Sequence, residues 1–265
     1  MERTGVREYE AGALIERSLS CSQFVEIEGI FTHFANSEIM PPGGTTQSPE
    51  PMEIASGEEK ESPLYNRVEA SLQLERFQEA LSIYEKRSEP QPAIRHTANS
   101  GATLRMPESY FDMVRPGVLF YGVYPARDVE RTIEVKPALT WRSKVIYSKV
   151  TRNGRSVSYG SLWQADVDSQ IATIPCGYAD GYFRRMTNQS RVIINGKSYP
   201  QVGRICMDQF MVNTGTDQVK VGDEVTLMGG GIAPEELADW AGTNEYEVMT
   251  NISARVPRVF LGAVQ

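Results

Sequence analysis

The sequence is poor in the residues that form disulfide frameworks and metal sites. It has 265 residues but only three cysteines and two histidines. Cys21, Cys176 and Cys206 lie far apart, are odd in number and form no CxxC pair. This argues against a disulfide framework and a zinc site, and it favours a reducing, cytoplasmic location.

Long apolar runs and a surplus of basic residues are also missing. No apolar run approaches the roughly 18 residues of a transmembrane helix, and the charged start MERTGVREYE has no signal-peptide core. The 27 basic residues are outnumbered by 34 acidic ones, giving a net charge of −7. We therefore expect neither a membrane nor a nucleic acid as partner. Small-molecule chemistry stays open, because a few arginines can still converge on an anion.

The first half of the chain alternates between predicted helices and strands. Residues 8–20 and 65–87 are predicted to be helices. The second is predicted to be amphipathic, because most of its large apolar residues fall at helical spacing; they are Val68, Leu72, Leu74, Phe77, Leu81 and Tyr84. Residues 24–34 are rich in β-branched and aromatic side chains and predict a strand, and residues 95–102 predict a short strand or loop. Such spacing is typical of βα units with a parallel sheet.

Between the first strand and the second helix, residues 37–63 are dense in Pro, Gly, Ser and Glu. Such a segment cannot bury a core, and we expect a mobile surface loop.

The character of the sequence changes near residue 134. Alternating segments predict strands within 141–150, 155–160, 170–180, 203–212 and 223–229. Asn153-Gly154 and, more clearly, Asn195-Gly196 mark hairpins, because a type I′ turn needs two residues with positive φ. Residues 234–242 are the one helix expected here, with Pro at the start and Gly at the end. We expect two domains, 1–133 and 134–265.

Several residues could carry chemistry, but each has a simpler explanation. His33 lies in an apolar predicted strand, where a buried core histidine is the commoner case. His96 opens the polar string HTANSGA, which could cradle a phosphate but could equally be a turn. Arg115, at a predicted strand end before Pro-Gly, could aim a cation at a ligand or be a surface arginine.

The tyrosines Tyr159 and Tyr178 each lie beside a glycine. A tyrosine can transfer protons when a nearby cation lowers its pKa, although most tyrosines do not. Each of these features is unspecific when it is taken alone.

Taken together, these segments resemble one family. GIFTHFA, RHTANSGA, DMVRPGVLFYG, SVSYG, IPCGYADGYFRR, VGRICMDQFMV and NEYEV occur in this order and spacing in bacterial alanine racemases, which are isomerases. The opening MERTGVR resembles the MGRxGxR segment of that family. The resemblance runs from Met1 to about Phe260, interrupted by residues 37–63. It implies an α/β plus β fold: the C-terminal strands of a partial (β/α)8 barrel, followed by a β-rich domain.

The resemblance also implies pyridoxal 5′-phosphate as cofactor and a role for each matching residue. Arg115 would contact the pyridine nitrogen and hold it unprotonated. His33 would hydrogen-bond both Arg115 and Tyr159. The phosphate would be bound by residues of four segments: Ser100, Gly117, Val118 and Tyr246, with Asn99 nearby.

The implied substrate is alanine, and the implied product supplies D-alanine for peptidoglycan in the cell wall. Tyr159 would be the base on the L-alanine side. Arg3 and Met207 would bind the substrate carboxylate, and Tyr178 would narrow the entrance. The family shares its sites across a homodimer, with Tyr159, Tyr178 and Met207 reaching into the partner.

One departure from the family concerns the Schiff-base lysine, which the family carries in an early AVVKANAYGHG-like segment. None of the seven lysines ends a buried strand before a Gly/His loop; they are Lys60, Lys86, Lys136, Lys144, Lys149, Lys197 and Lys220. Because Arg3, His33, Arg115 and Tyr159 are all present, we expect a truncated sequence rather than a degenerate gene. We also expect this chain alone to be inactive.

The sequence is consistent with three hypotheses. The full-length protein is an alanine racemase; or this chain is a non-catalytic fragment or dimerisation partner of a complete racemase; or the protein is a racemase for serine or another small amino acid. An upstream VVKANAYGHG-like segment would decide between the first two. Assays of the full-length protein on alanine and serine would decide on the third.

Overall fold

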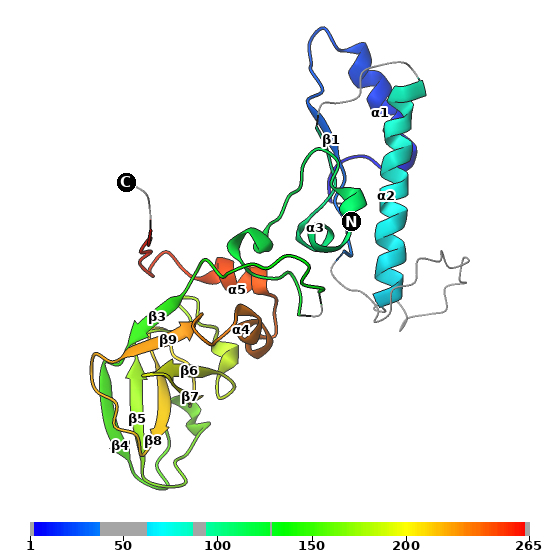
Figure 1. Cartoon of the computed structure of the whole chain (residues 1–265). Helices are drawn as coiled ribbons and strands as arrows, with labels where there is room; N and C mark the ends of the chain where they lie inside the picture. The colour runs from blue at the N-terminus through cyan, green and yellow to red at the C-terminus, as the bar shows by residue number, and fades with distance from the viewer. Residues whose placement is uncertain (1–2, 38–62, 87–93, 128, 263–265) are drawn as a thin grey trace. The chain divides into compact units, whose positions relative to one another are not determined.

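The computed structural model describes residues 3–37, 63–86, 94–127 and 129–262. The chain divides into two compact units, Met1–Val135 and Lys136–Gln265, each described by itself below (Figure 1). The loop predicted at 37–63 lies outside the described residues, apart from its two end positions. No helix in the described ranges is long and apolar enough to span a bilayer.

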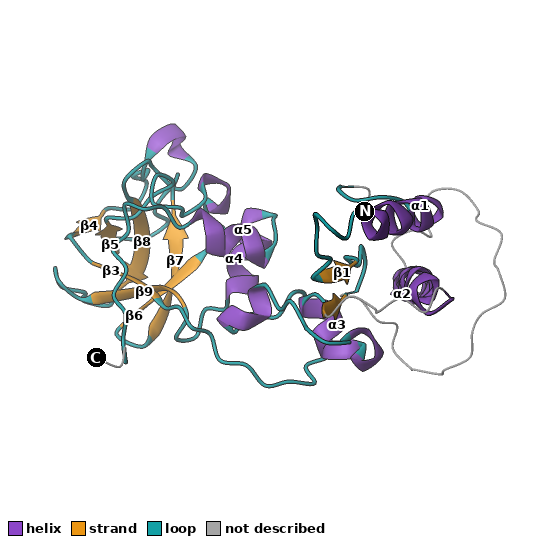
Figure 2. Cartoon of the chain, turned by 90° about the horizontal axis from the view of Figure 1, so that it is seen from above, coloured by secondary structure: helices purple, strands orange, loops and turns teal. Residues whose placement is uncertain are grey.

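Two helices of the first unit, α1 (Glu8–Ser20) and α2 (Pro63–Lys86), form where the sequence predicts helices. They lie side by side in both views (Figures 1 and 2). Residues three and four apart on α2 form its buried stripe; they are Ala70, Leu74, Phe77, Leu81 and Tyr84. Leu72, which does not keep this spacing, is 41% exposed. Two residues beyond Ala70, the helix has turned more than half-way round.

The strands β1 (Gly29–Phe31) and β2 (Ile94–His96) pair in parallel, with Phe31 opposite His96. The strand predicted at 24–34 is therefore wrong in its first half. There, the chain turns instead: the amides of Phe24 and Val25 both donate to the carbonyl of Cys21. Phe24 is 80% exposed, so its β propensity has no core to pack against.

After β2 the chain forms a short helix rather than continuing as a strand or loop. Helix α3 (Ser100–Arg105) begins at Asn99, whose Oδ1 accepts a hydrogen bond from Ala102 N at 3.0 Å. The 3₁₀ turns η2 (Pro107–Ser109) and η3 (Val118–Tyr121) follow. Arg115 lies in the loop between these turns, so its expected place at a strand end is wrong.

The second unit is a curled sheet of seven antiparallel strands (Figure 1). The strands are β3 (Trp141–Lys144), β4 (Tyr147–Thr151), β5 (Ser169–Ile174), β6 (Arg191–Ile194), β7 (Lys197–Val202), β8 (Phe210–Gly215) and β9 (Glu224–Met228). Their order is β3-β9-β6-β7-β8-β5-β4. The two outer strands are joined by only Val145 and Ile146, whose amides donate to Asp223 and Thr173. This short connection requires the sheet to curl back on itself.

The two predicted hairpins have different outcomes. β6 and β7 pair across Asn195 and Gly196, whose φ values of 50° and 78° match a type I′ turn. The hairpin predicted around Asn153-Gly154 is wrong, because β4 pairs with β5 instead. Of the predicted strand 155–160, only Ser156 makes a bridge, to Gln164.

The other strand predictions are too long. β5 ends at Ile174 and β8 begins only at Phe210, so residues 175–180 and 203–209 are loops. These loops carry two of the predicted site residues, Tyr178 and Met207.

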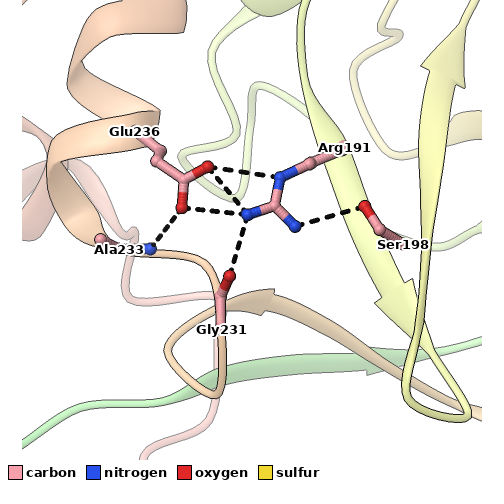
Figure 3. A network of polar contacts seen from close by, with 5 residues as sticks. All are labelled: Arg191, Ser198, Gly231, Ala233 and Glu236. Carbon is pink, nitrogen blue, oxygen red and sulfur yellow. Dashed lines mark hydrogen bonds and ion pairs between the residues drawn. The ribbon is translucent and has the colours of Figure 1, made fainter.

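Helix α4 (Pro234–Ala241) forms as predicted and ends at Gly242 in the left-handed region, with φ of 64°. A second helix, α5 (Glu245–Asn251), was not expected. Both helices lie at one side of the sheet (Figure 2). Arg191 of β6 holds α4 through a bidentate ion pair with Glu236 (Figure 3). The core of this unit includes Tyr182 stacked on Phe210, with ring centroids 4.6 Å apart.

Candidate functional site

The residues that follow the two parallel strands converge on Arg115. Its Nη2 donates to the carbonyl oxygens of Thr32, at 2.9 Å, and Thr97, at 3.2 Å. The same atom lies 3.4 Å from Nδ1 of His33, and Nη1 contacts Nδ1 of His96. In barrel folds, sites form at the carboxyl ends of the parallel strands. Here the guanidinium of Arg115 contacts residues at the carboxyl ends of both β1 and β2.

The electrostatics of this cluster keep the imidazoles neutral. Burial, followed by the charges of Arg115 and Arg3, lowers the pKa of His33. Burial and then Arg115 lower the pKa of His96. A neutral imidazole nitrogen can accept a hydrogen bond from the guanidinium, whereas an imidazolium cannot. Phe31 stacks on His96 with centroids 5.2 Å apart, and Arg115 lies over the same Phe31 ring.

A second feature of the first unit is a set of donors around Ser100. The buried Ser100 Oγ accepts hydrogen bonds from Gly117 N, at 2.8 Å, and Leu119 N, at 3.5 Å. Asn99, beside it, accepts from Ser37 Oγ at 2.6 Å. Backbone N–H groups that converge on one oxygen are donors already arranged for an anion such as a phosphate. A phosphorylated cofactor fits here if one of its oxygens shares or replaces Ser100 Oγ as the acceptor of these N–H groups.

The position of Tyr159 in the second unit is set by its neighbours in the chain. Ser158 has a φ of 67°, and its Oγ donates to the carbonyl of Arg204 at 2.6 Å. A Cβ on Gly203 would lie only 2.5 Å from Val157 O, so these two segments pack backbone against backbone. Tyr159 itself is 72% exposed on the turn η4 (Tyr159–Ser161). A fixed backbone thus presents a phenol to solvent.

Tyr178 and Met207 are brought together by a second close approach. Tyr178 N donates to Cys206 O at 3.1 Å, and Ala179 N donates to Met207 O at 3.0 Å. A Cβ on Gly177 would lie 2.3 Å from both of those carbonyl oxygens, so only glycine permits this contact. Both side chains remain partly exposed.

Tyr246 lies in the first turn of α5, whose far end is attached to the loop of Tyr178. Asn251 Nδ2 donates to Gly181 O at 3.3 Å, and Ser253 N donates to Asp180 O at 3.0 Å. The segments that carry Tyr159, Tyr178, Met207 and Tyr246 therefore form one connected set in the second unit.

The structure thus places the predicted residues in two groups. His33, Asn99, Ser100, Arg115, Gly117 and Val118 belong to the first unit, as does the exposed Arg3, whose charge reaches His33. The predicted bond between His33 and Tyr159 joins different units and stays a prediction.

Sequence reasoning missed two partners in the first group. The contact of His96 with Arg115 was not expected, although RHTANSGA was singled out. The approach of Leu119 N to Ser100 Oγ was not expected either, and the role of the Val118 N–H toward a phosphate stays a prediction.

Comparison with known proteins gives the family. Residues 1–125 match the model of the alanine racemase N-terminal domain, and residues 138–260 match that of the C-terminal domain. The chain belongs to the alanine racemase family. An alanine racemase of Chlorobaculum tepidum is 41% identical over 261 residues, which is 98% of this chain and 61% of the relative. That of Carboxydothermus hydrogenoformans is 40% identical and covers 96% of this chain and 63% of its own length.

Solved structures agree with this assignment. The alanine racemase of Streptomyces lavendulae superposes with a TM-score of 0.84 at 32% identity, covering 99% of this chain and 64% of that one. An alanine racemase of Bacillus anthracis with bound L-Ala-P gives 0.79 at 34% identity, covering 99% and 62%. The fold is therefore α/β plus β, a partial (β/α)8 barrel followed by a β-rich domain, as predicted. The chain spans somewhat more than three fifths of these relatives.

Proposed function

We propose that the protein to which this chain belongs interconverts L-alanine and D-alanine with pyridoxal 5′-phosphate. It would work in the cytoplasm and supply D-alanine for peptidoglycan. Membership of the family supports the reaction class. The observation that carries the proposal is the guanidinium of Arg115, held by two imidazoles and two carbonyls at the ends of β1 and β2.

Arg115 would hold the pyridine nitrogen of the cofactor. A guanidinium has donors but no acceptor, so the ring nitrogen beside it would be kept unprotonated, as a second positive charge there is costly. The bound cofactor supplies an electron sink for the negative charge that develops at the substrate α-carbon. The imidazoles and carbonyls that contact Nη1 and Nη2 would keep the guanidinium oriented toward the ring.

The phosphate would lie at the start of α3. Its ligands would be Ser100 Oγ, the N–H groups of Gly117 and Val118, and the hydroxyl of Tyr246, with Asn99 nearby. The convergence of amides on Ser100 Oγ supports this part of the proposal.

Tyr159 would hold or remove the substrate α-proton at its phenolic oxygen on the L-alanine side. Arg3 and Met207 would bind the substrate carboxylate, and Tyr178 would narrow the entrance. We propose a homodimer in which the 134–265 domain of one protomer completes the 1–133 domain of the other.

The lysines of this chain lead to a separate proposal, that these 265 residues do not racemise alanine by themselves. Within the described part of the first unit the only lysine is Lys86, exposed at the end of α2; Lys60 lies outside the described residues. After incubation with the cofactor, borohydride reduction and removal of excess reagent, we expect no stoichiometric pyridoxyl adduct on any of the seven lysines. A single fully labelled lysine would overturn this proposal.

The racemase proposal is tested on the full-length protein with Tyr159→Phe. Loss of the phenolic proton acceptor should slow racemisation about 10²- to 10⁴-fold. The matched control is Tyr147→Phe, another exposed tyrosine of the same unit, on β4. Solvent deuterium exchange, followed separately from L- and D-alanine, should show the larger loss from the L side. Equal rates for Tyr159→Phe and the parent would contradict the proposal, and faster turnover of serine would change the substrate.

A further inference from the structure

One arginine outside the proposed site joins the two loops that carry Tyr178 and Met207. The Tyr178 loop (residues 175–182) follows β5, and the Met207 loop (residues 203–209) precedes β8. Arg255 Nη2 donates to Asp208 Oδ1 at 2.7 Å, and its Nε lies 3.4 Å from Asp180 Oδ1. Asp180 is two residues after Tyr178, and Asp208 is the residue after Met207. The guanidinium thus bridges the two loops.

The main chain that presents Arg255 is itself held firmly. Arg258 donates to the carbonyl oxygens of Ile252, at 2.8 Å, Ser253, at 3.1 Å, and Val256, at 2.6 Å. Ser253 N donates to Asp180 O, which attaches this segment to the Tyr178 loop. Arg255 therefore extends from a backbone already fixed to one loop and reaches the other.

The two carboxylates have different surroundings, and this difference shows what the arginine contributes. The side chain of Asp180 is 13% exposed, and its Oδ2 accepts from Gly177 N at 2.9 Å, so it closes the turn Gly177–Asp180 that contains Tyr178. Asp208, in the Met207 loop, is 60% exposed. Without a cation between them, the repulsion of two negative charges would weaken the contact between the loops. The guanidinium of Arg255 attracts both carboxylates and so connects the two loops.

We propose that Arg255 is a positioning residue that sets the spacing between Tyr178 and Met207. This inference rests on the proposed function for the roles of those two side chains, the entrance and the substrate carboxylate. Arg255 acts through Asp180 and Asp208 and does not itself contact substrate. Loss of Arg255 should weaken substrate binding more than it slows transfer of the α-proton.

The first test measures the loops directly and needs neither cofactor nor substrate. Amide exchange of Tyr178 and Ala179, which donate to Cys206 O and Met207 O, is followed by NMR in this chain and in Arg255→Gln. We expect exchange to accelerate about threefold or more, as for loss of an ion pair worth about 0.7 kcal/mol. The control is Arg142→Gln, which removes a similarly exposed pair with Glu224 on β3 and β9. It should leave both amides unchanged.

Two further variants separate the link from general loss of stability. Asp208→Asn removes only the ion pair between Arg255 and the Met207 loop. It should also accelerate amide exchange of Tyr178 and Ala179. Combined with Arg255→Gln it should add little, since both changes break one link. Arg255→Lys should restore part of the protection. Unchanged exchange in Arg255→Gln, or acceleration spread evenly over the whole unit, would overturn the inference.

The second test uses the full-length enzyme. Arg255→Gln should raise KM for L-alanine about three- to fivefold while kcat changes less than twofold, because only uniform binding is weakened. A fall in kcat with KM unchanged would overturn the positioning role. If the amides respond but the protein does not racemise alanine, the proposed function fails while the structural link stands.

Discussion

The guanidinium Nη2 of Arg115 lies 3.4 Å from Nδ1 of His33, although 82 positions separate the two residues in the chain. The same atom donates to the carbonyl of Thr32 at the end of β1 and to that of Thr97 after β2. One side chain therefore holds together the ends of two parallel strands that pair over only three residues each. The stability of the first unit should depend on it.

Replacing Arg115 by lysine tests this dependence. Lysine keeps the charge but cannot donate in a planar fork to several acceptors at once. Because partly buried acceptors lose their partners, we expect the free energy of unfolding to fall by about 2 kcal/mol, measured by urea denaturation. Arg76→Lys, in an exposed pair with Glu8, is the control and should change it by less than about 0.5 kcal/mol. Equal effects of the two changes would contradict this view of Arg115.

The pH dependence of stability provides a second prediction. His33 and His96 are the only histidines, and both have pKa values lowered below 6.5 by burial and Arg115. The unfolded chain therefore binds more protons than the folded chain as pH falls below about 6.5, so the free energy of unfolding should decrease there. The contribution of the two neutral histidines to the free energy of unfolding should be fully present above that pH. The measurement is urea denaturation at intervals from pH 7.5 to 5.

The control for this prediction is the double variant His33→Asn, His96→Asn, which should flatten the slope between pH 7 and 5. Carboxylates with lowered pKa values, such as Asp112 with a pKa of about 2, lose their contribution only in more acidic solution. An unchanged slope in the double variant would show that other groups take up the protons.

The sequence predicts best the elements whose causes are local. The apolar period of α2 and the Asn195-Gly196 turn are decided within a few residues, and both form as expected. The pairing of β4 with β5 instead of residues 155–160 is a long-range choice, which Asn153-Gly154 cannot reveal. Helix α5 is seven residues long, too short for a periodic pattern, and its one sequence marker is the cap at Asn244.

For the site, resemblance supplied residues that physical reasoning alone left ambiguous. His33 could not be distinguished from a core histidine, because its contact with Arg115 depends on the parallel pairing of β1 and β2. The contact of His96 with Arg115 has the same origin and was missed. Residues that act together across distant segments become visible only when the register of the strands is known.

Gly177 provides a third prediction, on the approach of the two loops. In Gly177→Ala, a Cβ would lie 2.3 Å from Cys206 O and Met207 O, so the backbones must separate. We expect a loss of about 3 kcal/mol or more in the free energy of unfolding. Gly196→Ala is the matched control, since its Cβ meets nothing within 4 Å and only the φ of 78° is unfavourable. It should cost about 1 kcal/mol.

Thermal denaturation of these two glycine variants, followed by circular dichroism, measures the difference. If Gly177→Ala were as mild as Gly196→Ala, the close contact of the loops would be refuted.

The last prediction concerns the attachment of α4 to the sheet (Figure 3). Arg191 donates to both carboxylate oxygens of Glu236 and to Gly231 O, and Glu236 Oε1 also accepts from Ala233 N at the start of α4. The two side chains are only 32% and 28% exposed, so water screens them less than a surface pair. A double-mutant cycle with Arg191→Met and Glu236→Gln should therefore give a coupling energy of about 1 kcal/mol or more. The same cycle on Arg142 and Glu224, exposed by 58% and 56%, should give less than about 0.5 kcal/mol. Equal coupling in the two cycles would mean that burial does not strengthen the Arg191 pair, and α4 would then be held by its apolar face alone.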